Sequence, residues 1–270
     1  MMKKLILILA ACLLTVSCVF TITGRGGVVV TGGCTEEGID LTENREVAPF
    51  RSIISSIPCN VYYTQSEKQE VRVETTEEFV QKVLTEVDDG TLEIRLQEGT
   101  YHHLILRVVV SSPAIESIKV SGSGNLFHEG VLHADGDLSL RTSGSGMIQT
   151  GDIVCDGFSG KTSGSGSVLT GSISCTSFSG TTSGSGHFRV YALSAEENAS
   201  AHVSGSGGIN LGKVAVNGDL ELRTSGSGSI RVDGNCRNVT ASTSGSGSIT
   251  GNLTYESIQK SKSGSGNVSL

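Results

Sequence analysis

The stretch LSLRTSGSGMI, residues 138–148, decides the fold of this 270-residue chain. Apolar or small residues alternate with polar ones along it, and a period of two residues is typical of a β-strand. The same alternation returns at residues 220–230, around another Ser-Gly-Ser-Gly tetrapeptide. In this register the apolar side chains face an interior, whereas Ser143 and Ser145 face outward.

The tetrapeptide recurs at a nearly constant spacing of 22, 20, 20, 21, 21, 19 and 19 residues. A unit of this length cannot bury its apolar face alone, but stacked units bury a continuous core. Each unit holds about three short strands. We therefore expect an all-β fold, a right-handed parallel β-helix with coils of about 20 residues, in which the glycines fill a narrow corner. The copies begin at Ser121, Ser143, Ser163, Ser183, Ser204, Ser225, Ser244 and Ser263.

The last repeat differs from the others. Lys260 and Lys262 stand where earlier repeats carry apolar residues or threonine. A polar terminal coil of this kind would cap the open end of the sheets against edge-to-edge association. A rod end without such a cap would favour end-to-end pairing into a homo-oligomer, so the oligomeric state stays open.

Residues 1–18 have the pattern of an export signal, with two lysines before the apolar run at residues 5–14. That run is too short for a stable membrane span. The residues before Cys18 resemble the lipobox of bacterial lipoproteins, which predicts lipidation of Cys18 and a membrane as partner through the lipid. The alternative is ordinary signal cleavage near Ser17. Residues 19–44 are rich in glycine, and we expect a flexible tether there.

Residues 45–116 lack the tetrapeptide but show strand-like alternation, as in Leu92, Ile94 and Leu96. Between these strands, residues 77–87 have an apolar stripe at helical spacing, and Thr75 or Thr76 before it is suited to an N-cap. We interpret this segment as irregular early coils with a helix covering the N-terminal end of the repetitive β-helix at residues 117–270. A separate small α+β domain is the alternative.

Composition excludes one class of partner. The formal net charge is -7, with 20 basic and 27 acidic residues. This balance gives no basic footprint for DNA or RNA, so we expect no nucleic-acid partner. The 36 glycines and only 3 prolines suit short strands and tight turns better than a helical bundle.

Several segments resemble a known family. NVYYTQ at residues 60–65, VRVE at 71–74 and DGTLEIRL at 89–96 precede the tetrapeptides, and Gly-Ile-Asn stands at residues 208–210. Over about residues 45–268, the chain resembles the putative auto-transporter adhesin family named for its head GIN domain. The resemblance implies a β-helical exported protein or lipoprotein of Bacteroidetes, and it supplies no catalytic motif.

The implied location is the cell envelope, with the lipid anchor in the outer membrane. Surface lipoproteins of Bacteroidetes often carry an acidic export tag after the lipidated cysteine. Here Cys18 is followed by Val19-Phe20-Thr21, which favours the periplasmic face over the cell surface.

Many parallel β-helices act on polysaccharides, so a polysaccharide-active enzyme is an alternative. The candidate aspartates mostly stand beside glycine, which is typical of turns. Equivalent positions elsewhere hold Thr176, Glu196 and Asn217, so no acidic column builds up. We therefore expect no catalytic residue, and the scattered histidines predict no metal or other cofactor. The aspartates are Asp135, Asp137, Asp152, Asp156, Asp219 and Asp233.

Cys155 and Cys175 occupy the same inward place in successive repeats. Their Cα atoms should be about 5 Å apart, which is within disulfide range. Stacking in register points both side chains the same way, however, so we favour buried free thiols over a disulfide.

The outward serines have two interpretations. Serine suits a stacked corner without any function; alternatively, a hydroxyl ladder contacts glycans or envelope proteins, flanked by Arg141, Lys161 and Arg223. We expect a non-enzymatic adhesin or surface-binding module, with a structural envelope component lacking a specific ligand as the alternative. The serines of this expected face are Ser143, Ser145, Ser163, Ser165, Ser183, Ser185, Ser225 and Ser227.

Overall fold

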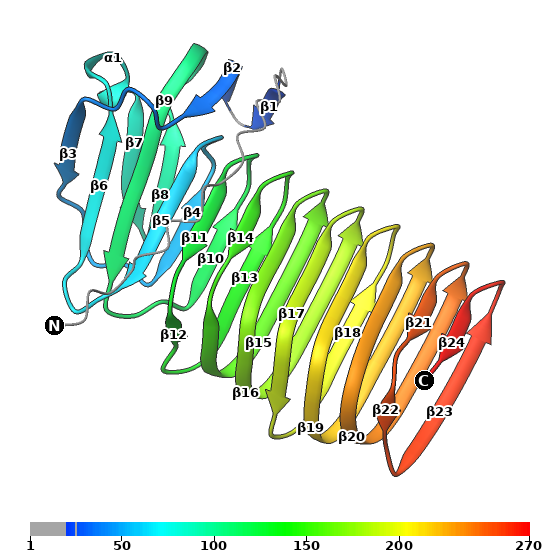
Figure 1. The fold of residues 1–270 in the computed structure, drawn as a ribbon. Coiled ribbons are helices and arrows are strands. Elements are labelled where there is room, and N and C mark those ends of the chain that lie inside the picture. Colours follow the sequence, from blue (N-terminus) through cyan, green and yellow to red (C-terminus); the bar gives the residue numbers. More distant parts are fainter. Residues whose placement is uncertain (1–19, 25) are drawn as a thin grey trace, which may run out of the picture.

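The computed structural model describes residues 20–24 and 26–270 and confirms the predicted all-β class. Parallel strands stack in a row from the N-terminal sheets to the C-terminus, forming a parallel β-helix of about seven coils (Figure 1). The expected signal sequence and Cys18 lie outside the described residues. Within those residues, no helix has both the length and the apolar character that a membrane crossing requires.

Each coil contributes strands to three faces, and every strand pairs in parallel with its equivalent in the next coil. The longest strands bend around a corner and so serve two or three faces in succession. The strands of the coils are β10 (Ser117–Val120), β11 (Asn125–His128), β12 (Val131–His133), β13 (Leu138–Thr142), β14 (Met147–Gln149), β15 (Asp152–Gly164), β16 (Ser167–Gly184), β17 (His187–Ala195), β18 (Ala199–Val203), β19 (Gly208–Gly226), β20 (Ser229–Gly245), β21 (Ser248–Thr250), β22 (Leu253–Thr254), β23 (Ser257–Ser263) and β24 (Asn267–Ser269).

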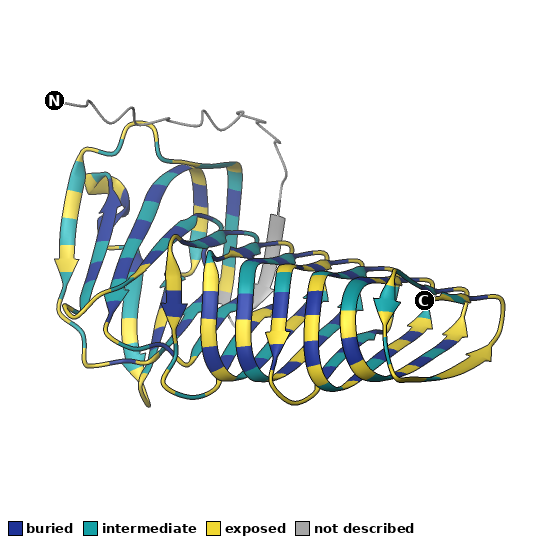
Figure 2. Cartoon of the chain, turned by 60° about the horizontal axis from the view of Figure 1, so that its bottom comes forward, coloured by how far each residue is buried: buried dark blue, intermediate teal, exposed yellow. Residues whose placement is uncertain are grey.

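Burial alternates along these strands, as the bands of buried and exposed residues in Figure 2 show. The inward positions predicted from the repeat are confirmed, because their side chains are at most 3% exposed. Lys260 and Lys262 are exposed in the last coil. The predicted inward residues are Phe158, Val168, Phe178, Phe188, Val203, Ile209, Val239 and Ile249.

Three phenylalanines form a ladder inside the coils. The ring centroids of Phe158 and Phe178 lie 5.5 Å apart, and those of Phe178 and Phe188 lie 5.9 Å apart, all nearly parallel. Phe188 fills the space left by two inward glycines, since a Cβ at Gly160 or Gly180 would lie 2.5 or 2.8 Å from its ring. The glycines and the large ring therefore compensate one another in volume.

The corner formed by the tetrapeptides admits only glycine at the second Gly. This residue is buried in every copy. A Cβ at Gly166 would lie 2.4 Å from the backbone oxygen of Gly146 in the preceding coil. The first Gly has a positive φ in several copies, such as 127° at Gly184, which L-residues rarely adopt.

The N-terminal part consists of two sheets that continue faces of the β-helix. In the first sheet, β4 lies between β10 and β8, and β7 pairs with β8. In the second sheet, β5 lies between β11 and β9. There β9 also pairs with β6, and β6 pairs with β3. Its elements are β1 (Phe20–Gly24), β2 (Gly26–Thr35), β3 (Leu41–Arg45), β4 (Ser52–Ser55), β5 (Asn60–Gln65), β6 (Glu70–Thr75), α1 (Glu77–Val80), β7 (Val83–Asp88), β8 (Thr91–Leu96) and β9 (Gly99–Ser112).

The prediction of a helix over residues 77–87 is wrong beyond the first turn. Only α1 is helical, Thr76 makes no side-chain cap hydrogen bond, and β7 replaces the rest. Asp89 and Gly90, with φ of 43° and 69°, form a tight turn between β7 and β8. Such a turn matches the twist of an antiparallel hairpin, so strand pairing prevails over the weak helical stripe.

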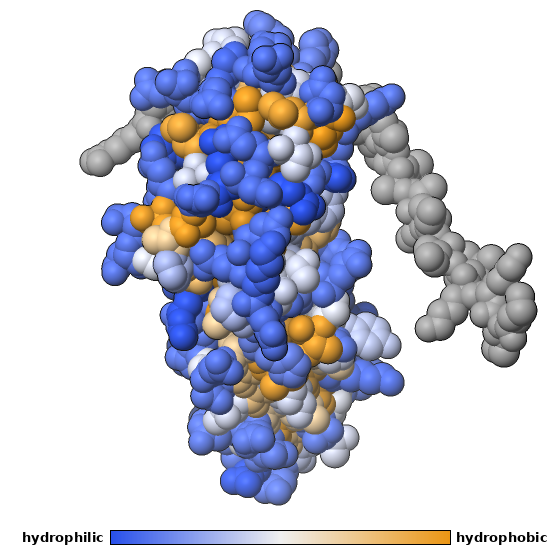
Figure 3. Space-filling model, turned by 90° about the vertical axis from the view of Figure 1, so that its left-hand side faces the viewer, coloured by the Kyte–Doolittle hydropathy of each residue, from blue (hydrophilic) through white to orange (hydrophobic). Residues whose placement is uncertain are grey.

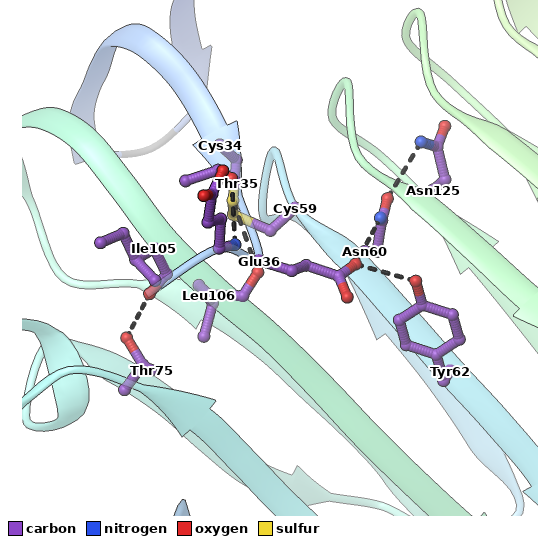
Figure 4. The surroundings of a disulfide bond; sticks show 11 residues. Cys34, Thr35, Glu36, Cys59, Asn60, Tyr62, Thr75, Ile105, Leu106 and Asn125 are labelled. Carbon is purple, nitrogen blue, oxygen red and sulfur yellow. Dashed lines mark hydrogen bonds between the residues drawn. A yellow bond between two sulfur atoms is a disulfide. The ribbon is translucent and has the colours of Figure 1, made fainter. Parts of the chain in front are cut away.

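The prediction of a flexible tether over residues 19–44 is also wrong from β2 onward, where the chain forms strands. β2 pairs in parallel with β9, and β3 pairs antiparallel with β6. A disulfide between Cys34 and Cys59, with Cα atoms 5.5 Å apart, joins this segment to the loop before β5 (Figure 4). Distant chain segments thus supply the hydrogen-bond partners that a glycine-rich sequence lacks locally.

Polar contacts reinforce this attachment. Glu36 accepts hydrogen bonds from Asn60 (2.7 Å) and from the Tyr62 hydroxyl (2.8 Å). Burial raises the pKa of Glu74, but hydrogen bonds from Arg107 and Arg72 outweigh it and leave that pKa below its ordinary value. The surface seen from this N-terminal side is mostly hydrophilic, with hydrophobic residues in separate patches (Figure 3).

Among the cysteines of the described residues, three are free and buried, as predicted for Cys155 and Cys175; the third is Cys236. Burial raises the pKa of Cys155 to about 12 and those of Cys175 and Cys236 to about 11. Their thiolate fraction at neutral pH is therefore negligible, and they pack as small apolar groups.

Candidate functional site

One face of the β-helix, together with the residue just before each of its strands, carries three columns of polar side chains. We name it face 1. Its strands pair in register from coil to coil, so equivalent side chains are about 4.8 Å apart. Face 1 comprises residues 117–120, 138–142, 158–162, 178–182, 199–203, 220–224, 239–243 and 258–262.

A groove of about 760 Å³ runs over face 1. Its lining extends from Glu116 to Thr240 and includes side chains from every coil between them. The groove therefore crosses the coils, along the axis of the β-helix. A site of this form suits an extended ligand that contacts several coils at once, rather than a compact small molecule.

The middle column of the groove consists of serine hydroxyls. Ser139, Ser159, Ser179 and Ser200 stand in register on four consecutive coils. The Ser200 hydroxyl donates to the Ser179 hydroxyl oxygen at 3.3 Å. Hydroxyls both donate and accept hydrogen bonds, so this column can bind a partner that presents polar groups of either kind.

The first edge of the groove carries carboxylates and amides. Asp137, Asn198 and Asp219 line it. The Asn198 side-chain oxygen accepts a hydrogen bond from the backbone N–H of Asp219 (2.9 Å), and the Asn238 amide donates to the Asp219 carboxylate (2.8 Å). These bonds between coils hold the edge in place.

A column of basic side chains follows on the side of the serine column opposite these carboxylates. Arg141 lines the groove, whereas the other members of the column flank it. Lys119, Arg141 and Lys161 are neighbours on successive coils. After Thr181, the same column continues with His202 and Arg223. The structure thus brings Arg141, Lys161 and Arg223, all expected from the sequence, into one column. Lys119 and His202 were missed, although each stands two residues before a tetrapeptide, as the other three do.

The expected serine face lies elsewhere, at the corner that the tetrapeptides form after face 1. None of its eight serines lines the groove. Ser143, Ser145 and Ser165 are exposed, whereas Ser163 is half-buried and donates to the backbone oxygen of Thr142 at 3.3 Å. The corner serines do form columns, but these project from a narrow edge and not from a concave surface.

Three of the aspartates considered for catalysis lie near one turn: Asp135 and Asp137 line a small pocket there, and the backbone N–H of Asp156 donates to the Gly136 oxygen (2.9 Å). The others lie apart. Asp137 and Asp219 both line the groove but stand four coils apart, roughly 19 Å at the usual strand spacing. Asp152 accepts a hydrogen bond from the backbone N–H of Ser172 (2.7 Å), and Asp233 accepts one from Asn252 (2.9 Å). These are turn contacts, and the groove aspartates exceed the separation that paired carboxylates need for glycoside hydrolysis.

Comparison with known proteins supports an adhesin-type assignment. The model of the family described as "putative auto-transporter adhesin, head GIN domain" matches residues 49–215 and 183–270. No curated protein matches the chain.

Solved structures share the fold. A putative adhesin from Parabacteroides merdae is 19% identical with a TM-score of 0.77, covering 88% of this chain and 98% of its own. A putative adhesin from Parabacteroides distasonis is also 19% identical, with a TM-score of 0.72 and coverage of 87% and 99%. A structure named as a putative lipid binding protein, also from P. distasonis, is 21% identical, with a TM-score of 0.72 and coverage of 90% and 99%.

Proposed function

Because the chain belongs to the putative auto-transporter adhesin, head GIN domain family, we propose that it is an envelope lipoprotein that binds an extended polymer through the groove on face 1. The role is non-enzymatic adhesion. The ligand is a glycan chain or an extended segment of another envelope protein.

The single observation that carries this proposal is the groove itself. It crosses consecutive coils and presents a serine hydroxyl at the same place on four of them, from Ser139 to Ser200. A repeating polymer can therefore make equivalent contacts on each coil, and several weak contacts add up to useful affinity. The flat hydroxyl column also needs little rearrangement on binding, since its strands are held by hydrogen bonds on both sides.

Filling the groove should weaken binding strongly. In Ser159→Tyr/Ser179→Tyr, two rings would occupy its centre on an exposed strand surface that tolerates aromatic residues. We expect wild type to bind a subset of a glycan array or of bacterial cell surfaces saturably, and the variant to lose at least tenfold in affinity.

The matched control is Ser145→Tyr/Ser165→Tyr, which places the same rings on exposed corner positions outside the groove. This control should bind as wild type does. Loss of binding in the corner variant alone would move the site to the tetrapeptide serines. No binding by folded wild type would favour a structural envelope role without a specific ligand.

Lipidation of Cys18 would hold the β-helix at the outer membrane, with the first described strand starting at Phe20. Because β2 is tied to Cys59 by the disulfide, the anchor would attach close to the folded body. In cells, the protein should partition with membranes and gain the mass of acyl chains, and Cys18→Ser should release it. Equal membrane association of that variant would contradict the lipid anchor.

A further inference from the structure

Three cations stand in register on face 1 without anionic partners. Lys119 is the neighbour of Arg141, and Arg141 is the neighbour of Lys161. Within residues 27–270, none of the three lies within ion-pairing distance of a carboxylate. Arg141 donates only to the neutral hydroxyl of Ser139, at 3.2 Å. We call Lys119, Arg141 and Lys161 the basic ladder.

The basic ladder costs stability in the unbound protein. Like charges opposite one another on adjacent strands destabilise a sheet. Elsewhere on face 1 the repulsion between like charges is smaller. Thr181, which is neutral, follows Lys161 in the column, and Arg223 pairs with Glu221. An anion bound across the ladder would relieve the repulsion at all three coils.

Resting on the function proposed above, we infer that the groove's polymer is an acidic polysaccharide whose charged groups lie along the basic ladder. The hydroxyls of the polysaccharide would then meet the serine column, which stands two residues before the basic ladder on each strand. The groove also contains four carboxylates, those of Glu116, Asp137 and Asp219 on the opposite edge and that of Glu221 after Ser200 in the serine column. They disfavour a polymer that carries charge on both of its sides and restrict the acidic groups to the side of the basic ladder. This arrangement favours an acidic sugar chain over a nucleic acid.

The test uses polygalacturonate oligomers as probe and their methyl esters as the uncharged match on the same backbone. Affinity for the purified protein is measured by calorimetry at low and high salt. We expect the acidic oligomer to bind at least tenfold more tightly than the ester, and its affinity to fall as salt screens the ladder.

Variants localise the effect. Arg141→Gln/Lys161→Gln should weaken binding of the acidic oligomer about tenfold or more, which corresponds to about 1.4 kcal/mol. The matched control, Arg189→Gln/Arg231→Gln, removes the same charge from exposed positions on another face. It should bind as wild type does, and circular dichroism of all variants checks that the fold is kept.

The outcomes separate this inference from the proposed function. Equal binding of the ester and the acid, or equal losses in the two variants, would overturn the inference while leaving a polymer groove intact. Tighter binding of single-stranded DNA than of the acidic oligomer would also overturn it. Failure of every polymer, on the glycan array as well, would overturn both.

Discussion

Replacing Phe188 by alanine should lower the free energy of unfolding by about 3–5 kcal/mol. The ring is 1% exposed and lies between coils, stacked near Phe158 and Phe178. Its neighbours at Gly160 and Gly180 have no side chains that could move into the vacated space. The cavity would therefore stay open, and urea unfolding measures the loss as a lower midpoint.

A double-mutant cycle tests the volume compensation behind this prediction. Other coils combine an inward leucine with an inward isoleucine, as in Leu222 and Ile230. Gly180→Leu alone should destabilise strongly, because its Cβ would meet the Phe188 ring. Combined with Phe188→Ile, it should cost clearly less than the sum of the two single changes. Additive effects would show that the ring and the glycine do not share one space.

Replacing Gly166 by alanine should cost about 3 kcal/mol of unfolding free energy, near the upper end for forced overpacking. The added Cβ would lie 2.4 Å from the backbone oxygen of Gly146, and neither group is the end of a flexible side chain. The two coils must separate locally, which weakens their parallel pairing. Thermal unfolding should show a marked drop in midpoint.

The control for this change is Gly136→Ala, in the turn before β13. A Cβ there meets nothing within 4 Å, and the residue has no positive φ. Alanine should therefore be neutral or slightly stabilising, since it restricts the unfolded chain. An equal loss of stability in both variants would contradict the claim that the tetrapeptide glycines are required by contact between coils.

The β-helix could be predicted because its information is local and repeated. A period of two residues identifies strands, and a nearly constant repeat length stacks them in register, so the inward positions of Phe158 or Ile249 follow directly. The N-terminal segment could not be predicted in the same way. The apolar residues within 83–87 fit the spacing of a helix and that of a strand equally well. Pairing with β8 makes this segment a strand.

Contacts between distant segments explain the other misses. β2 is a strand because β9, about 70 residues later, supplies its partner, and Cys34 finds Cys59 only in the folded state. The columns of face 1 are present in the sequence at fixed offsets before each tetrapeptide. Their association into a groove depends on how far each corner projects. Spacing alone does not give this, so the sequence predicts a binding face at the corner serines instead.

The central claim, a polymer groove on face 1, is tested most directly by acetylating surface lysines with and without saturating polygalacturonate and locating the modified residues by mass spectrometry. The account predicts protection of Lys119 and Lys161, with unchanged labelling of Lys260 and Lys262 in the terminal coil. Equal labelling of all four lysines in a saturated complex would place the bound polymer elsewhere and contradict the claim.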